Sequence, residues 1–227
     1  MQAFALPWAH SASAPDDRAY WPTMAKNRVE PFSDGIFAIA ATLLVLELHV
    51  PGPGAEGGLA RALREEWPSF ASYVVSFAII GIIWVNHHTV LDHLARIDRT
   101  VLFLNLLLLL WVALLPFPTN LLATYMREGG SDERIAGLVY TANMALMGFS
   151  FGTLWRYAVR RGLLSEGLSD AEIRDRTRRF SIGAPLYVVA MLVALVSAPA
   201  CLAMNAALAL YYALPGLGQM RAPPSRA

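Results

Sequence analysis

Charge-poor apolar stretches of membrane-spanning length are the feature that most constrains this chain. A helix crosses the roughly 30 Å hydrocarbon core of a bilayer with about 20 residues, because each residue adds about 1.5 Å. Four stretches fit that length, and the second of them holds no charged side chain. They cover residues 31–50, 69–86, 101–125 and 135–159. The sequence therefore predicts an all-α integral membrane protein.

A fifth apolar stretch, over residues 181–214, is too long for one crossing. Its 34 residues would reach about 50 Å as a single helix. Pro199 lies near its middle, and proline lacks the backbone N–H that a helix interior requires. We expect a hairpin of two short spans here, which brings the total to six transmembrane helices. The arginine-rich linker before it, residues 160–179, is expected to form a solvated helix capped by Ser169.

Composition excludes several other classes of protein. Hydrophobic residues make up 56% of the chain, above the roughly 45–50% of soluble globular proteins. The net charge of +1 provides no basic field, so no nucleic-acid partner is expected. Cys201 is the only cysteine, which excludes an intrachain disulfide and a CxxC redox or metal motif. We expect no enzymatic activity and no cofactor.

The distribution of positive charge predicts the orientation in the membrane. Loops on the cytoplasmic side of membrane proteins are enriched in lysine and arginine. With both termini inside, the cytoplasmic segments hold fourteen of the 18 basic residues. We therefore predict a six-helix domain over residues 28–215 between cytoplasmic tails at 1–27 and 216–227. Arginine greatly outnumbers lysine, which is typical of a GC-rich bacterial genome and favours the bacterial plasma membrane.

Asp34 lies near the start of the first span and needs a polar environment. A carboxylate within a span costs at least about 2.5 kcal/mol and generally faces the protein interior or a water-filled cavity. Arg28 lies about 240° away around the helix, so the partner is expected on another helix. The alternative is a solvated position at the headgroup boundary. Polar residues expected at the same depth are Trp84, Asn86, His87, His88, Asp92, Asp98 and Asn105.

The first helix also carries an apolar stripe, formed by Ile39, Leu43, Leu46 and Val50 at spacings of i, i+4, i+7 and i+11. A stripe of this kind serves lipid contact or core packing in many membrane helices. Arranged around a symmetry axis, it would instead form constrictions that gate by dewetting. Thr42, beside the stripe, would add a ring of hydroxyls able to replace part of an ion's water shell.

Two further observations bear on the pore interpretation. Gly35, Ala38 and Ala41 are small, and we expect them to form an opposite face that packs closely against other helices. No Thr-Val-Gly-Tyr-Gly filter occurs in the sequence. Any selectivity for potassium must therefore arise differently and is expected to be modest.

The histidines leave two other functions open. A proton-coupled secondary transporter could use Asp34 and His88 as a relay. A membrane enzyme, haem protein or metal protein could use His87, His88 and His93 as ligands. Their spacings of one, five and six residues do not place two imidazoles one helical turn apart, as a zinc pair at i and i+4 would require. No structural metal is therefore predicted.

Arg28, Phe32, Ser33 and Asp34 form an Arg-x-x-x-Phe-Ser-Asp motif that, together with four later segments, resembles the signature of the transmembrane protein 175 family of potassium channels. The resemblance extends over about residues 26–125 and continues beyond them only as hydropathy. The four later segments are the Gly-Ile-Phe-Ala-Ile-Ala-Ala-Thr-Leu-Leu-Val-Leu-Glu run that follows the motif, Trp84-Val85-Asn86-His87-His88, Leu104-Asn105-Leu106 and Leu115-Pro116-Phe117-Pro118-Thr119.

The resemblance implies a single-repeat, bacterial subunit of six helices that assembles into a homotetramer in the lipid bilayer. Its first helix would line a pore that conducts potassium passively, with weak to moderate selectivity over sodium and some permeability to protons. By position, the constrictions would be Ile39, Leu43 and Leu46, with potassium passing near Ile39 and the Thr42 layer. An interhelix network would join the signature residues Arg28, Phe32, Ser33 and Asp34 to Trp84, Asn86, His87, His88 and Asn105.

Overall fold

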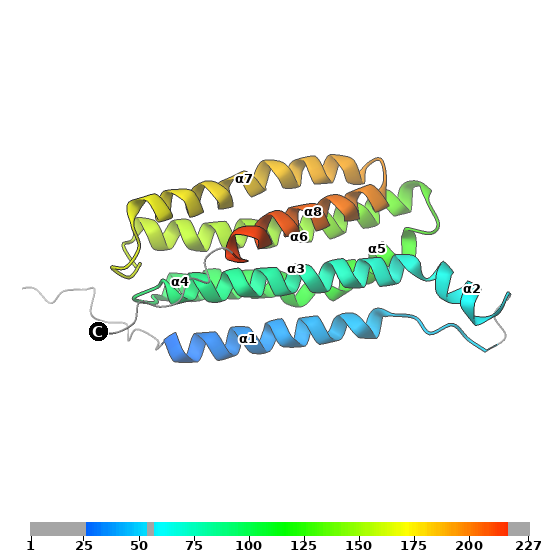
Figure 1. Cartoon of the computed structure of the whole chain (residues 1–227), viewed down its shortest axis with the longest axis horizontal. Coiled ribbons are helices and arrows are strands. Elements are labelled where there is room, and N and C mark those ends of the chain that lie inside the picture. The colour runs from blue at the N-terminus through cyan, green and yellow to red at the C-terminus, as the bar shows by residue number, and fades with distance from the viewer. Residues whose placement is uncertain (1–25, 54–56, 218–227) are drawn as a thin grey trace, which may run out of the picture.

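Helices make up the part of the chain that the computed structural model describes, residues 26–53 and 57–217 (Figure 1). Short turns and loops connect them, and one isolated bridge joins Leu94 to Leu164. The elements are α1 (Lys26–Leu43), the 3-10 helix η2 (Leu44–Glu47), α2 (Gly58–Glu65), α3 (Trp67–Asp92), α4 (Arg99–Leu114), α5 (Pro116–Tyr125), α6 (Gly130–Arg160), α7 (Asp170–Ala194) and α8 (Ala198–Leu217).

The long helices lie side by side in an elongated bundle, with α1 along one edge and α7 along the other (Figure 1). The buried side of α1 packs against α3 and α4. Around the middle of the bundle, α6 contacts α4, α5, α7 and α8. The loops after α3 and α6 meet at one end of the bundle, where Ala95 N–H donates to Leu163 O at 2.9 Å and Ser165 N–H donates to His93 O at 2.9 Å.

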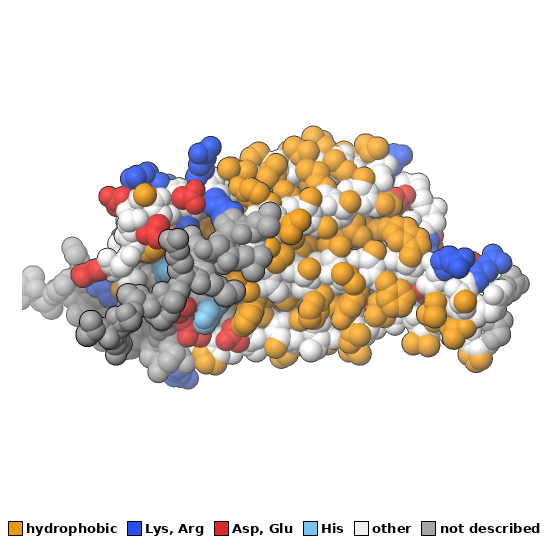
Figure 2. All heavy atoms as spheres, viewed as in Figure 1, with side chains coloured by type: hydrophobic (Ala, Val, Ile, Leu, Met, Phe, Trp, Pro, Cys, Tyr) orange, Lys and Arg blue, Asp and Glu red, His pale blue; other side chains and the backbone are white. Residues whose placement is uncertain are grey.

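Four helical segments are long and apolar enough to cross a membrane. They are Arg28–Glu47, Trp67–Asp92, Arg99–Tyr125 and Gly130–Arg160, close to the first four predicted spans. A broad belt of hydrophobic side chains covers the visible face between the charged ends of the bundle (Figure 2). Exposed apolar surface on this scale suits contact with lipid rather than with water.

The third predicted span is two consecutive helices rather than one. The first, α4, ends at Leu114, and α5 begins at Pro116. Pro116 and Pro118 have no backbone N–H, so neither can donate to the last turn of α4. Proline is well tolerated at the first positions of a new helix, which explains why α5 starts there.

The break between the last two helices was predicted at Pro199 and lies about one turn before that residue. Helix α7 ends at Ala194 and α8 begins at Ala198, so Pro199 is the second residue of α8. The Glu133 carboxylate of α6 accepts the Ala198 N–H at 2.9 Å and satisfies one of the free donors at the start of α8. Pro199 itself needs no such acceptor, and this explains its position in the first turn.

Ser169 caps α7 as predicted, but a separate solvated helix over 160–179 does not form. Ser169 and Glu172 make a capping box, in which Glu172 N–H donates to Ser169 Oγ at 3.3 Å and Ser169 N–H donates to Glu172 Oε2 at 2.9 Å. From there α7 continues without interruption to Ala194. The predicted tails at 1–27 and 216–227 lie almost wholly outside the described residues.

Candidate functional site

The buried face of α1 is tied to α3 and α4 by a continuous chain of hydrogen bonds. Asn105 Nδ2, on α4, donates to Ser33 Oγ at 3.0 Å, and Ser33 Oγ donates to Val29 O at 2.9 Å. On its other side, the Asn105 Oδ1 atom lies 2.7 Å from His87 Nε2 of α3. Since an amide oxygen can only accept, His87 donates from Nε2. Ser33, His87 and Asn105 are all buried, so each would be costly without its partner.

Asp34 finds its partner on α3. The indole Nε1–H of Trp84 donates to Asp34 Oδ1 at 2.8 Å. The Trp84 ring also stacks on His88, with 6.3 Å between ring centroids. His88 Nε2 lies 3.4 Å from Asp92 Oδ2 in an exposed pair. Asp34 and His88 are therefore both next to Trp84, and the indole lies between them.

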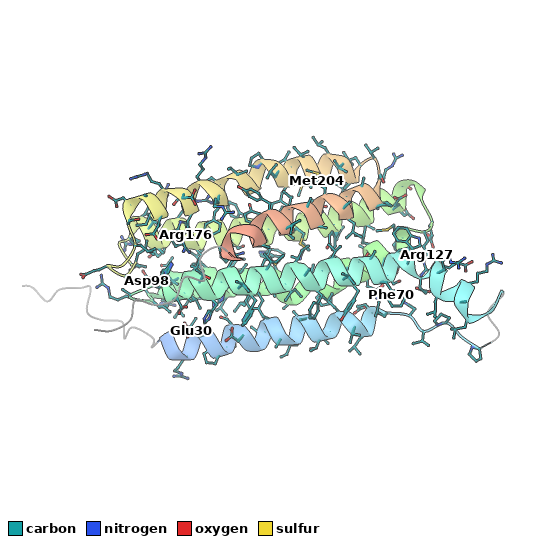
Figure 3. All side chains as sticks on the ribbon, in the orientation of Figure 1. Glu30, Phe70, Asp98, Arg127, Arg176 and Met204 are labelled. Carbon is teal, nitrogen blue, oxygen red and sulfur yellow. The ribbon has the colours of Figure 1, made fainter. Side chains whose placement is uncertain are left out.

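Five of the predicted residues are thus linked by side-chain hydrogen bonds in two groups, Ser33–Asn105–His87 and Asp34–Trp84. The other predicted residues make no hydrogen bond to either group within the described chain. Arg28 and Phe32 are exposed because they lie one turn apart on another face of α1. Asn86 donates to Ile82 O of its own helix at 2.9 Å. Asp98 instead caps α4 and accepts from Tyr157 Oη at 2.8 Å (Figure 3 labels Asp98).

Among the residues that the structure describes, the opposite side of α1 and η2 is only partly covered by other helices. Ile39, Leu43 and Leu46 are 59%, 40% and 74% exposed. Thr42 is also exposed, and its hydroxyl lies 2.9 Å from Ile39 O and 3.0 Å from Ala38 O. The single hydroxyl proton is used by these backbone carbonyls, so the Thr42 oxygen faces outward as an acceptor. The apolar stripe therefore does not pack into the core of its own bundle.

Within the described chain, two of the three small residues do not pack against another helix, so their packing role stays a prediction for contacts between subunits. Gly35 and Ala38 are exposed, and a Cβ atom added at Gly35 would meet nothing within 4 Å. Only Ala41 is partly buried against the core. The buried residues on the inner side are Ser33, Phe37 and Ala40 of α1 and Leu44 of η2. Phe37 contacts His87, with 5.3 Å between ring centroids.

A polar group at the far end of this helix was not predicted. Glu47, the last residue of η2, accepts a hydrogen bond from Asn120 Nδ2 of α5, and Asn120 Oδ1 accepts one from Thr124 Oγ1 at 3.0 Å. These three residues line a cavity of about 470 Å³ together with Leu43 and Leu46. A carboxylate at the end of an apolar span is by itself the signal that would have identified Glu47.

The predicted metal alternative has no ligand set in the part of the chain that the structure describes. No three His, Cys, Asp or Glu side chains gather there closely enough to hold a metal ion. His87 is occupied by Asn105, and His88 lies beside Asp92.

Sequence comparisons identify relatives of this chain, one of which matches most of its length. A family profile described as endosomal/lysosomal potassium channel TMEM175 matches residues 28–116. A potassium channel of Streptomyces collinus is 47% identical over 201 residues, which cover 88% of this chain and 96% of that protein. The endosomal/lysosomal proton channel TMEM175 of Homo sapiens is 37% identical over 121 residues, which are 49% of this chain and 24% of the human protein.

The fold has a counterpart among solved structures. The crystal structure of a lysosomal potassium-selective channel TMEM175 homolog from Chamaesiphon minutus superposes with a TM-score of 0.75 and 36% sequence identity. The match covers 84% of this chain and 97% of that one. The family predicted from the Arg28 to Asp34 signature is confirmed. This chain is a membrane protein of the TMEM175 family.

Proposed function

We propose that this chain is one subunit of a homotetrameric, potassium-permeable cation channel whose pore is lined by its first helix. Conduction is passive and driven by the electrochemical gradient. The relatives named as potassium channels in Streptomyces collinus and Chamaesiphon minutus support the permeant ion. No enzymatic step and no cofactor enter this account, and the partners are further copies of the chain, the lipid bilayer and potassium itself.

The exposed stripe of α1 is the observation that carries the proposal. The helix at the edge of the described bundle exposes the side chains of Ile39, Leu43 and Leu46. Hydrogen bonds attach the other side of that helix to α3 and α4. One helix cannot enclose an aqueous path, so the path requires several copies around an axis. The stripe would then supply stacked apolar rings, which block ions unless they are wetted.

Selectivity is proposed to be weak to moderate. Each Thr42 would place a hydroxyl oxygen next to the Ile39 ring, where it replaces part of the hydration shell of potassium. A single layer of this kind coordinates an ion less completely than a filter of several carbonyl rings does. We propose that protons also pass, since the animal relatives are named proton channels.

The subunit would contribute six transmembrane helices to the bacterial plasma membrane. The six would be α1 with η2, α3, α4 with α5, α6, α7 and α8. An even number of crossings brings the start of α1 and the end of α8 to the same side. Positive charge favours the cytoplasm for that side. Arg160 and Arg161 lie where α6 meets the loop to α7, and four further arginines lie in the first turns of α7.

Potassium flux from liposomes tests the proposal. Purified protein is reconstituted into liposomes loaded with potassium, and a membrane potential is imposed without the potassium ionophore valinomycin. The liposomes should then release potassium at a rate that rises with the voltage. A preparation that is folded and tetrameric but releases no potassium would contradict the proposal. The Asp34→Asn variant should still conduct if it folds, because Asp34 is held by Trp84 at the side of α1 away from the stripe.

The same assay separates the channel from a proton-coupled transporter. With the membrane potential held at zero, a transporter that uses Asp34 and His88 would drive potassium against its concentration gradient when a proton gradient is applied, and would lose this activity in Asp34→Asn. At zero potential a channel only dissipates the potassium gradient, in the wild type and in the variant alike. The relatives' names give no support to the transporter, since those compared are called channels.

A further inference from the structure

A long apolar cavity lies on the side of the bundle away from α1. It has a volume of about 420 Å³ and is enclosed by α3, α6, α7 and α8. Most of its wall is aliphatic or aromatic, including Ile79, Met147 and Val188. Phe149 and Val188 are 60% and 57% exposed, so the cavity reaches the outer surface between α6 and α7, where the bilayer begins.

The cavity has the length of a lipid tail. Its wall on α6 runs from Ala142 to Arg156, which is about 21 Å along a helix that rises about 1.5 Å per residue. That is more than half the thickness of a hydrocarbon core of about 30 Å and therefore comparable to one leaflet. A flexible chain entering between α6 and α7 would stay within an apolar environment over this whole length.

Arg156 gives the cavity one charged end. Both terminal nitrogens of its guanidinium lie 3.5 Å from the position that a Cβ atom would take at Gly152, one turn back along α6. The side chain is therefore directed toward the interior of the membrane rather than toward the end of the helix. Among residues 26–53 and 57–217, Arg156 makes no ion pair and no hydrogen bond.

A guanidinium at this depth needs an anionic partner. Arginine that faces the membrane interior is costly unless it is paired or reaches water. Its planar donors match the oxygen atoms of a phosphate group. Two further arginines, Arg161 and Arg176, lie at the same end of the bundle, where they add to the attraction for negative charge (Figure 3 labels Arg176).

We propose that this cavity binds one anionic phospholipid per subunit, with the phosphate on Arg156 and one acyl chain along α6 toward Ala142. The bilayer supplies such a ligand directly, and only an amphipathic anion satisfies both the guanidinium and the apolar wall. The site is separate from the proposed pore, since no residue of α1 lines the cavity. Its occupancy can therefore be measured whether or not the protein conducts.

Native mass spectrometry of the full-length protein tests the proposal. Delipidated protein in detergent is titrated with dioleoyl phosphatidylglycerol, and bound lipid is counted per subunit. Arg156→Gln should bind about fivefold more weakly. Arg160→Gln, one turn farther along α6 and exposed, should bind like the wild type. Inorganic phosphate at the same concentration should not displace the lipid, because it cannot occupy the apolar part of the site.

Two variants that fill the cavity test the acyl chain separately. Ala145→Phe on α6 and Ala209→Phe on α8 keep Arg156 but occupy the space between the helices. Either variant that elutes as a folded species should lose the bound lipid. Equal binding by Arg156→Gln and Arg160→Gln would overturn the proposal. So would full lipid retention in a folded cavity-filling variant, or displacement of the lipid by phosphate.

Discussion

Ser33 and Leu43 lie on the same helix in opposite surroundings. Ser33 is fully buried and makes two hydrogen bonds, whereas Leu43 is 40% exposed and belongs to the uncovered stripe. In a soluble protein this arrangement would be reversed, with the leucine inside and the serine outside. In the proposed channel, Ser33 attaches α1 to α4 through Asn105, and Leu43 narrows the ion path.

Shortening Leu43 should widen the path. Leu43→Ala removes methyl groups from the proposed constriction. A wider apolar ring loses its water less readily, so the single-channel conductance should rise by about twofold or more. Planar-bilayer recording measures the change. Val74→Ala, an equally apolar truncation on the exposed side of α3, should leave conductance unchanged. Unaltered current in an assembled Leu43→Ala protein would mean that the stripe does not face the pore.

Removing the Asn105 amide should loosen the anchor of α1. Asn105→Leu keeps the approximate volume but leaves His87 Nε2 without its acceptor and removes the donor to Ser33 Oγ, which keeps only its bond to Val29 O. We expect a loss of about 1–2 kcal/mol in the free energy of unfolding. Thermal unfolding in detergent provides the measurement. Asn86→Leu is the matched control, because the Asn86 side chain donates only to its own helix. Equal losses in the two variants would argue against a special role of Asn105.

At the scale of elements, the first four spans could be predicted because each is a nearly uncharged run of sufficient length. The breaks were harder to place. Pro116 ends α4, although the apolar pattern runs on through it, because hydropathy carries no information on missing backbone donors. The start of α8 depends on Glu133, which is 65 residues away and invisible to any local pattern.

The candidate site shows the same limit. Depth alone suggested that Asp34 would meet the end of the second span, and Trp84 is there. The rotation of each helix about its axis could not be predicted. Arg28, Phe32 and Asn86 were assigned to the network, but within the described chain their side chains make no hydrogen bond to it. Gly35 and Ala38 were assigned to helix packing and are exposed in the described chain, so that role stays a prediction. Rotation is set by tertiary contacts such as Phe37 on His87.

A carboxylate at the junction between elements should make stability depend on pH. Glu66 lies between α2 and α3 and accepts hydrogen bonds from Arg127 and from Ser69 Oγ, the latter at 3.0 Å. Burial alone would raise the pKa of Glu66, but these hydrogen bonds outweigh it and lower the pKa below its ordinary value of 4.5. The contact therefore stabilises the fold above pH 4.5 and is lost as the pH falls through the lower pKa of the folded protein.

Thermal unfolding of Glu66→Gln at two pH values checks this dependence. The variant should be less stable than the wild type by about 1 kcal/mol at pH 7, and the difference should shrink as the pH falls below 4.5. Glu65→Gln removes a neighbouring carboxylate whose pair with Arg61 is exposed, so its effect should be smaller. A constant difference between wild type and Glu66→Gln from pH 7 to pH 3 would contradict the assignment.

At the scale of the whole molecule, we propose different roles for the two sides of the bundle. One edge is α1, which is anchored on its inner side and bare on its outer side (Figure 1). The far side holds the cavity between α3, α6, α7 and α8, which we assign to a lipid. In the proposed channel, copies of the chain would meet through α1 around an axis while the remaining helices face the bilayer.

Thiol block of potassium flux tests this arrangement most directly. In a Cys201→Ser background, single cysteines replace Thr42 or Leu46 on the exposed side of the first helix, or Val74 on α3 as the control. Each protein is reconstituted and treated with a positively charged methanethiosulfonate. We predict that modification at positions 42 and 46 strongly reduces the potassium flux and that modification at position 74 does not. Full modification at positions 42 and 46 with unchanged potassium flux would contradict a pore lined by the first helix.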